Sequence, residues 1–178
     1  MGQYYKPCVM DEDKKSVKVS ICSWDFSNGA KLMEHSYVGN RFVKAAERLL
    51  ATERNCCPFV WCGDYADGIV GDINAYDLAG GKDVKDWDSV PELEGEVRYI
   101  VNEDKKEFVR VPESDDDSWV IHPLPLLTCD GNGRDGGDYH GTDMDKVGIW
   151  AYDHIACKYD GWDSEGYKEL EVKFSEEF

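Results

Sequence analysis

The clearest helical pattern in the chain lies at NRFVKAAERLLATER, residues 40–54. Its apolar residues recur at three- and four-residue spacing, which places them on one face of a helix, with charges on the other face. These apolar residues are Phe42, Val43, Ala46, Leu49 and Leu50. Asn40 is a typical N-cap residue, and the residue before Pro58 avoids helical geometry. The pattern therefore predicts a core helix over Asn40–Arg54.

Strand patterns are more numerous. Some segments alternate strictly between apolar and polar residues, which is typical of a strand with one buried face, and others are short apolar runs. The predicted strands are Val17–Ile21, Phe59–Cys62, Trp119–Leu127, Val147–Ile155 and Leu170–Phe174. Pro123 and Pro125 lack the N–H that a sheet ladder needs, so the third of these is expected at a sheet edge or a bulge. The polar segments Ala79–Leu93 and Glu113–Ser118 predict surface loops.

Two segments, Val9–Val17 and Ile100–Phe108, share one pattern: an apolar run, a turn with Glu, Asp and two Lys, and a second apolar run. Each predicts a β-hairpin. A Gly-Asp-Tyr triplet follows each hairpin, at 63–65 and at 137–139. This internal repeat predicts two related half-units, residues 1–70 and 97–157, although similar turn chemistry can also arise by chance.

Together, these elements predict an α+β fold in a single domain over residues 1–178: a mostly antiparallel sheet with one main helix.

The composition indicates a folded and strongly acidic protein. Apolar residues make up 42% and aromatic residues 12% of the 178 residues, enough to build a core at this charge. The net charge is −17, and residues 60–178 carry thirty Asp or Glu against eleven Lys or Arg. Such a surface repels phosphate backbones and attracts basic protein surfaces, so direct nucleic-acid binding is not expected. The alternative is that the acidity only maintains solubility.

The expected compartment is the cytoplasm. The chain contains no run of about eighteen apolar residues, and its N-terminus lacks an apolar signal core, so neither a membrane span nor export is predicted. The seven cysteines are odd in number and lack the paired short spacings of zinc sites. They are expected as reduced thiols, most of them packed as small apolar side chains.

The glycine-rich stretch Thr128–Gly141, TCDGNGRDGGDYHG, is the first candidate site. Its glycines could turn backbone amides toward an anion, with Arg134 as the cation. The candidate ligand-binding residues are Asn132, Arg134, Asp138, Tyr139 and His140. Oxygen ligands at 130, 132, 135 and 138 also permit a calcium interpretation, without EF-hand spacing. The stretch matches neither a P-loop nor a dinucleotide motif, and a long tight turn is the structural alternative.

A second candidate is His35, which lies in Asn28–Asn40 next to Glu34 and Ser36. The pKa of histidine near neutrality suits acid–base catalysis, but most such histidines cap or pack. His122 and His154 are expected as packed strand residues.

A third candidate is the pair Asp64 and Asp67 in Trp61–Gly68. The two carboxylates could bind a metal or act as general acid and base. Capping of the turn is the alternative.

Several longer motifs occur in order along nearly the whole chain: MGQYYK, GAKLMEHSYVGN, VWCGDYAD, IHPLPLLT, GNGRDGGDY and VGIWAYD. Together they resemble an uncharacterised family found in bacteria, largely Gram-positive, and in their phages and plasmids. The chain departs from the family pattern at Asp135, Cys62 and Cys129. The resemblance transfers no catalytic residue, but it implies a phage or mobile-element protein in the bacterial cytoplasm.

Two functional hypotheses follow. The first is a non-enzymatic accessory protein whose acidic surface docks on a basic surface of a host protein, for example one that directs a nucleic-acid-targeting defence, as anti-CRISPR proteins do. The second is a phosphate- or nucleotide-binding protein or small enzyme that uses the GNGRDGGDY loop, with His35, Asp64 or Asp67 handling protons or a metal. A structural subunit of a larger particle is a third option. No cofactor is specified, and the sequence favours a protein that is not an enzyme.

Overall fold

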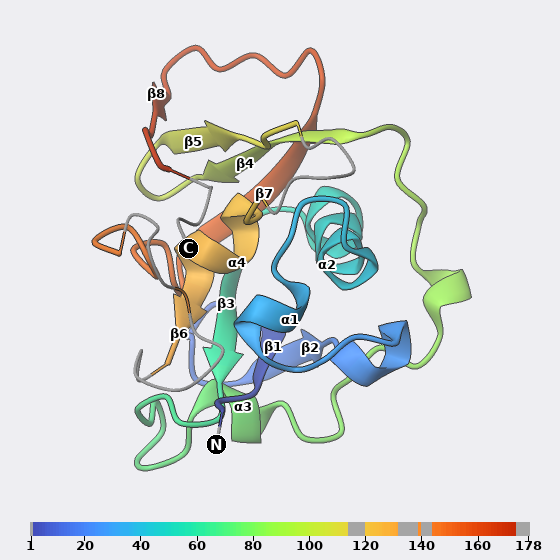
Figure 1. The fold of residues 1–178 in the computed structure, drawn as a ribbon, viewed down its shortest axis with the longest axis vertical. Coiled ribbons are helices and arrows are strands. Elements are labelled where there is room, and N and C mark those ends of the chain that lie inside the picture. Colours follow the sequence, from blue (N-terminus) through green and yellow to red (C-terminus); the bar gives the residue numbers. More distant parts are fainter. Residues whose placement is uncertain (1, 114–119, 132–138, 140–143, 174–178) are drawn as a thin grey trace.

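The computed structural model describes residues 2–113, 120–131, 139 and 144–173, and within them it shows an eight-stranded sheet with helices on both faces (Figure 1). The strands are β1 (Tyr5–Met10), β2 (Val17–Ser20), β3 (Cys57–Gly63), β4 (Val97–Asn102), β5 (Glu107–Arg110), β6 (Cys129–Asp130), β7 (His154–Tyr159) and β8 (Lys168–Glu169). The α-helices are α1 (Leu32–His35), α2 (Arg41–Ala51), α3 (Ala75–Leu78) and α4 (Pro123–Thr128), and two 3₁₀ turns are η1 (Ser23–Phe26) and η2 (Trp87–Ser89).

The strand order is β2-β1-β3-β7-β4-β5-β8, and β6 pairs with β3 beside β7. All neighbours are antiparallel except β3 with β6 and β5 with β8. The predicted α+β fold with a mostly antiparallel sheet is therefore confirmed.

The predicted main helix is confirmed as α2, which ends three residues early, at Ala51. Asn40 caps it as expected, because its Oδ1 accepts hydrogen bonds from the amides of Phe42 at 2.8 Å and Val43 at 3.4 Å. The apolar face is buried against the sheet. Burying a side chain such as Leu50 stabilises the fold by about 1.5–3 kcal/mol.

Both predicted hairpins are present, as β1–β2 and β4–β5. In each case the first hairpin strand also pairs with a later strand, β1 with β3 and β4 with β7, and β3 pairs with β7. The order β2-β1-β3 on one side is thus mirrored by β7-β4-β5 on the other. A relationship between the two half-units remains a prediction.

The predicted strand Trp119–Leu127 is wrong over its second half, which forms helix α4. His122 is the N-cap: its Nδ1 accepts from the Leu124 amide at 3.0 Å. Pro123 is the first helical residue, where a missing N–H costs nothing. All of α4 is buried, so its sequence shows no polar face that would identify a helix.

The other late strands are shifted. Most of Val147–Ile155 is a turn, and β7 begins at His154. At the end of the chain the paired residues are Lys168–Glu169, so the strand lies before the predicted Leu170–Phe174, of which Phe174 is outside the described residues.

Strand β3 has a core on each face. Phe59 and Trp61 face the main core beneath α2, whereas Val60 and Cys62 face a smaller core covered by α3. This alternation follows from the two-residue repeat of a strand. Within the described residues, no helix combines the length and apolar character needed to traverse a bilayer.

Candidate functional site

Strands β3 and β6 run parallel, so the chain leaves both at the same edge of the sheet. The paired residues are Trp61 with Cys129 and Cys62 with Asp130. Two candidate segments of the sequence, Trp61–Gly68 and the described start of Thr128–Gly141 as far as Gly131, therefore begin side by side. This edge is the candidate functional site.

The buried side chain of Gln3 lies between these two segments. Its Oε1 accepts a hydrogen bond from the Tyr65 amide at 3.3 Å. A Cβ atom at Gly63 or at Gly131 would lie closer to this same oxygen than van der Waals contact allows, so a side chain at either position would force Gln3 to shift. The two segments thus meet around one residue.

A pocket of about 400 Å³ opens next to the end of β6. Its lining includes Tyr5, Asp130, Tyr139, Met144, Val147 and Tyr152. The Tyr152 hydroxyl donates a hydrogen bond to Asp130 Oδ2 at 2.7 Å. Burial raises the pKa of the Asp130 carboxyl; this hydrogen bond partly lowers it, and the charge of Asp67 raises it again. The pocket therefore presents a half-buried hydrogen-bond acceptor among tyrosines.

Residues 64–77, which we call the acidic end segment, run from the end of β3 into α3 and lie at the lower edge of the molecule near the N-terminus (Figure 1). Asn74, which is 4% exposed, holds this segment. Its Nδ2 donates to the carbonyl oxygens of Asp64 and Ala66, both at 3.1 Å, and its Oδ1 accepts from the Asp77 amide at 3.0 Å. The backbone of the segment is thus fixed by one buried side chain.

The acidic end segment combines carboxylates with exposed apolar side chains. Its acidic residues are Asp64, Asp67, Asp72 and Asp77, and none of them forms an ion pair within the part of the chain that the structure describes. Tyr65, Val70 and Ile73 are 45%, 39% and 46% exposed. Tyr4, also 45% exposed, lies alongside, because its amide donates to Asp64 Oδ1 at 2.9 Å.

His35, the candidate base, is fully buried in the core, where it contacts Trp61. Its Nε2 accepts a hydrogen bond from Trp61 Nε1 at 3.0 Å, and its Nδ1 donates to the Gly29 carbonyl at 2.9 Å. Burial lowers the pKa of His35 to about 4, so the ring is neutral. Since both nitrogens are occupied, this histidine supports the fold.

The predicted pair Asp64 and Asp67 lies on one turn of the acidic end segment, where Asp64 caps the Tyr4 amide. Of the predicted ligand-binding residues, Tyr139 is buried and lines the pocket. The other four, Asn132, Arg134, Asp138 and His140, lie outside the described residues.

His122 is buried, as expected of a packed residue, but it caps helix α4 and is not in a strand, and its contact with Glu47 was not predicted. Its Nε2 contacts Glu47 Oε1 inside the core, between α4 and α2. The sequence does contain a signal: Glu47 lies four residues after Val43 and three before Leu50, on the apolar face of the helix. A carboxylate there needs a buried polar partner.

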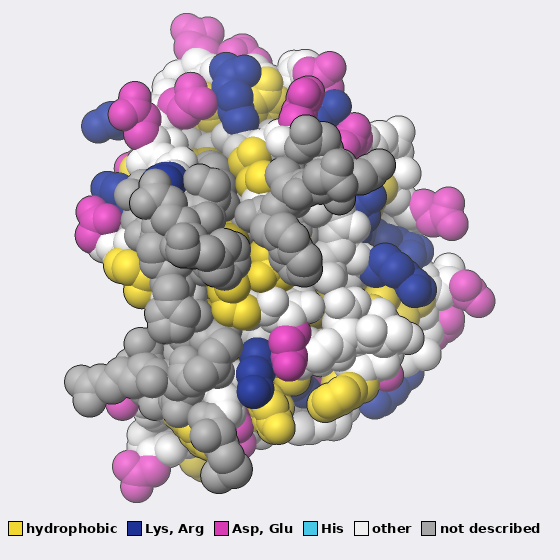
Figure 2. All heavy atoms as spheres, in the orientation of Figure 1, with side chains coloured by type: hydrophobic (Ala, Val, Ile, Leu, Met, Phe, Trp, Pro, Cys, Tyr) yellow, Lys and Arg dark blue, Asp and Glu magenta, His cyan; other side chains and the backbone are white. Residues whose placement is uncertain are grey.

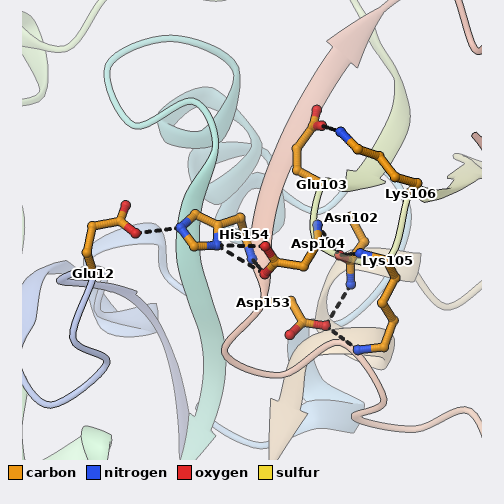
Figure 3. Close-up of polar contacts among 8 residues, drawn as sticks. All are labelled: Glu12, Asn102, Glu103, Asp104, Lys105, Lys106, Asp153 and His154. Atoms are coloured by element: carbon orange, nitrogen blue, oxygen red, sulfur yellow. Dashed lines mark hydrogen bonds and ion pairs between the residues drawn. The ribbon is translucent and has the colours of Figure 1, made fainter. Parts of the chain in front are cut away.

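His154 is a strand residue, as predicted, but its ring is partly exposed and forms a polar cluster at the start of β7 (Figure 3). Its Nε2 lies 2.6 Å from Glu12 Oε2, in the first hairpin turn. Its Nδ1 lies 3.0 Å from Asp104 Oδ2, in the second hairpin turn. Burial lowers the pKa of His154, but the hydrogen bonds to Asp104 and Glu12 outweigh it and give a net rise. We call these three residues the histidine clamp.

The neighbouring carboxylates are also paired with cations (Figure 3). Lys105 Nζ contacts Asp153 Oδ2, and Lys106 Nζ lies 3.1 Å from Glu103 Oε2. The histidine clamp and the contact of Lys105 with Asp153 thus join the two hairpin turns to the start of β7, whereas Glu103 and Lys106 pair within the second turn.

Among the described residues, no group of three or more His, Cys, Asp or Glu side chains is placed to hold a metal ion. All seven cysteines are free thiols, and Cys8, Cys62, Cys129 and Cys157 are buried.

Comparison of the chain with protein-family models, with curated proteins and with solved structures finds no match. The family resemblance of the sequence motifs is therefore still a prediction.

Proposed function

We propose that this protein is a non-enzymatic interaction protein that docks through its acidic end segment on a basic surface of a partner protein. The observation that carries the proposal is one anchored segment that combines exposed Tyr65, Val70 and Ile73 with carboxylates that form no ion pair among the described residues.

The two kinds of side chain have complementary uses. Carboxylates attract a basic partner from a distance and increase the association rate. Exposed aromatic and branched side chains provide apolar area that can be buried on binding. Tyrosine is enriched among the interface residues that contribute most of the binding free energy. The segment between β3 and α3 contains no Lys or Arg that would neutralise it from within.

The motif resemblance and the acidity together support a more specific proposal. We infer a phage or mobile-element accessory protein, located in the bacterial cytoplasm, that inhibits a host nucleic-acid-directed defence by covering its basic surface. Such a protein competes with a polyanion and binds neither nucleic acid nor membrane itself.

The test is capture of partners from bacterial host lysate at low and at high salt. A basic protein should bind at low salt and be released at high salt. The variant Asp64→Asn/Asp67→Asn/Asp72→Asn should weaken its binding by about tenfold or more.

The control changes the net charge equally at another exposed loop, Asp160→Asn/Asp163→Asn/Glu165→Gln, and should retain the partner. Equal loss with both variants would mean that net charge alone matters. If no basic protein is recovered at low salt, the proposal fails.

A second candidate function is small-molecule binding in the pocket at Asp130. The pocket adjoins the predicted glycine-rich loop, which favours this hypothesis, but the described lining presents a carboxylate that would repel phosphate. Ligands that donate hydrogen bonds or carry positive charge fit this lining better.

Thermal denaturation with a panel of nucleotides, amines and divalent metals tests this candidate, because a ligand that binds the folded state raises the melting temperature. Asp130→Asn should abolish stabilisation by an amine, whereas Arg134→Ala should abolish stabilisation by a nucleotide. A panel without any effect would exclude both forms of the hypothesis.

A further inference from the structure

The outward face of α2 carries basic residues above an apolar groove. Arg41, Lys44 and Arg48 are separated by three and four residues, so they lie along one side of the helix. The groove has a volume of about 490 Å³. It is lined by Phe26, Arg41, Lys44, Ala45, Arg48, Trp87, Glu92 and Leu93, which we call the basic groove. Figure 2 shows Lys and Arg side chains gathered over α2, on the right of the view.

Arg48 holds the far wall of the groove in place. Its guanidinium donates hydrogen bonds to the carbonyl oxygens of Trp87, at 3.0 Å, and of Pro91, at 2.9 Å, and it also contacts the Val90 carbonyl. The guanidinium carbon lies 5.5 Å from the centre of the Trp87 ring, a cation–π distance. The wall that faces α2 is therefore fixed before any partner arrives, which reduces the entropy cost of binding.

The apolar floor is also ordered. The rings of Phe26 and Trp87 meet edge to face with centroids 5.5 Å apart, and Phe26 packs on buried Phe42 at 6.0 Å. Leu93 closes the groove on the other side and is only half-buried. An apolar side chain from a partner would complete this aromatic contact and remove Leu93 from water.

The rim is positive. Arg41 and Lys44 are exposed, and within the described residues neither forms an ion pair. Of the described residues that line the groove, Glu92 alone is acidic. In a protein with a net charge of −17, this groove is a local exception, and its charge complements a negatively charged ligand.

We propose that the basic groove binds a short acidic segment of a partner protein. One apolar side chain of the segment lies between Trp87 and Leu93, and flanking Asp or Glu residues pair with Arg41 and Lys44. This inference is independent of docking through the acidic end segment, which lies at a different side of the fold (Figure 1).

The net charge of the protein decides between a peptide and a nucleic acid as the occupant. A nucleic-acid strand extends its charges well beyond the groove, so the acidic remainder of the surface repels it. A short peptide places only a few charges, all near the basic rim, and it supplies the apolar side chain that the floor accepts.

The experiment selects a displayed library of random peptides on the full-length protein, and measures the selected peptides by fluorescence anisotropy. Selected sequences should place Asp or Glu on either side of a Leu, Ile, Phe or Trp. Arg41→Glu/Lys44→Glu should weaken their binding by about tenfold or more, since two attractions become repulsions.

Charge reversal elsewhere, in Lys15→Glu/Lys168→Glu, provides the control and should leave affinity within about twofold. Leu93→Ser, which keeps the charge, should weaken the same peptides and so separates the apolar contact from the electrostatic one. Circular dichroism confirms that each variant is folded.

Four outcomes would overturn the proposal: selection of peptides without acidic residues, equal weakening by both charge reversals, no effect of Leu93→Ser, or displacement of the peptides by inorganic phosphate or by single-stranded DNA. None of these results bears on the acidic end segment, so the two proposals can fail separately.

Discussion

At the Cys57 end of strand β3, acidic side chains are paired with cations. At the Gly63 end, roughly 20 Å away along the strand, the acidic side chains of residues 64–77 form no ion pair with any residue that the structure describes. The first end holds the histidine clamp and the pairs made by Lys105 and Lys106. The second end holds the acidic end segment. The same kind of residue thus supports the fold at one end, whereas at the other end its charge is not balanced by an ion pair among the described residues.

The difference originates in local sequence. The hairpin turn after β4 contains its own two lysines beside its acidic residues, so its charges can be neutralised within the turn. Residues 64–77 include four aspartates and no Lys or Arg. Neutralisation there has to come from another part of the chain or from another molecule.

The largest expected effect comes from removing the anchor of the Gly63 end. Asn74→Ala deletes two hydrogen bonds to buried or half-buried carbonyls and the cap of α3. Its free energy of unfolding should fall by about 3 kcal/mol, measured by urea denaturation. The matched change Asn55→Ala, at the exposed Cys57 end, should cost less than about 0.5 kcal/mol. Similar losses for both variants would contradict the assigned role of Asn74.

A smaller effect concerns the pH dependence of the Cys57 end. The pKa of His154 is raised in the folded protein. Its contribution to stability is therefore fully present below its pKa in the unfolded chain, near 6.5, and is lost as the pH rises through its pKa in the folded protein. Between about pH 6 and pH 8, the free energy of unfolding of the unaltered protein should fall by up to about 1 kcal/mol more than that of the His154→Asn variant.

Urea denaturation of both proteins across this range gives the comparison, because every other titrating group is common to them. Parallel curves would show that the histidine clamp contributes no stability. Glu12→Gln should halve the difference, since one of the two carboxylates remains.

The smallest expected effect is a change in stability that has opposite signs at the two ends of β3. Neutralising Asp67 and Asp72 to Asn removes repulsion at the Gly63 end and should stabilise the protein by about 0.3 kcal/mol. Neutralising Asp104 to Asn at the Cys57 end should destabilise it instead, because a partner of His154 is lost. Melting temperatures at low salt measure both changes, and equal signs would refute the contrast.

Local patterns predicted much of the fold. The apolar stripe and Asn40 cap identified α2, and the paired turns identified both hairpins, because each depends on residues close in sequence. Helix α4 was missed because burial on every side removes the periodicity that distinguishes a helix from a strand. The turn before β7 was missed for a similar reason: Trp150 is buried within it.

The site was predicted less completely than the fold. The segments around Asp64 and Tyr139 were recognised by composition, but their common edge depends on a two-residue pairing between β3 and β6. Asp130 and Tyr152 were not singled out as a pair, since they meet only through that pairing and the turn before β7. The histidine clamp joins Glu12 to His154 across most of the chain, a contact that no local pattern indicates.

The position of Gln3 also affects how the protein must be handled. Gln3 is buried between the two segments of the candidate site, and the next residue, Tyr4, contacts Asp64. A sequence fused before Gln3 would therefore start close to Tyr4 and Asp64. An affinity tag fused there would crowd the surface that we propose captures a partner, and below about pH 6.5 a polyhistidine tag would add positive charge next to the aspartates. Immobilisation through a residue away from Tyr4 and Asp64 avoids this competition.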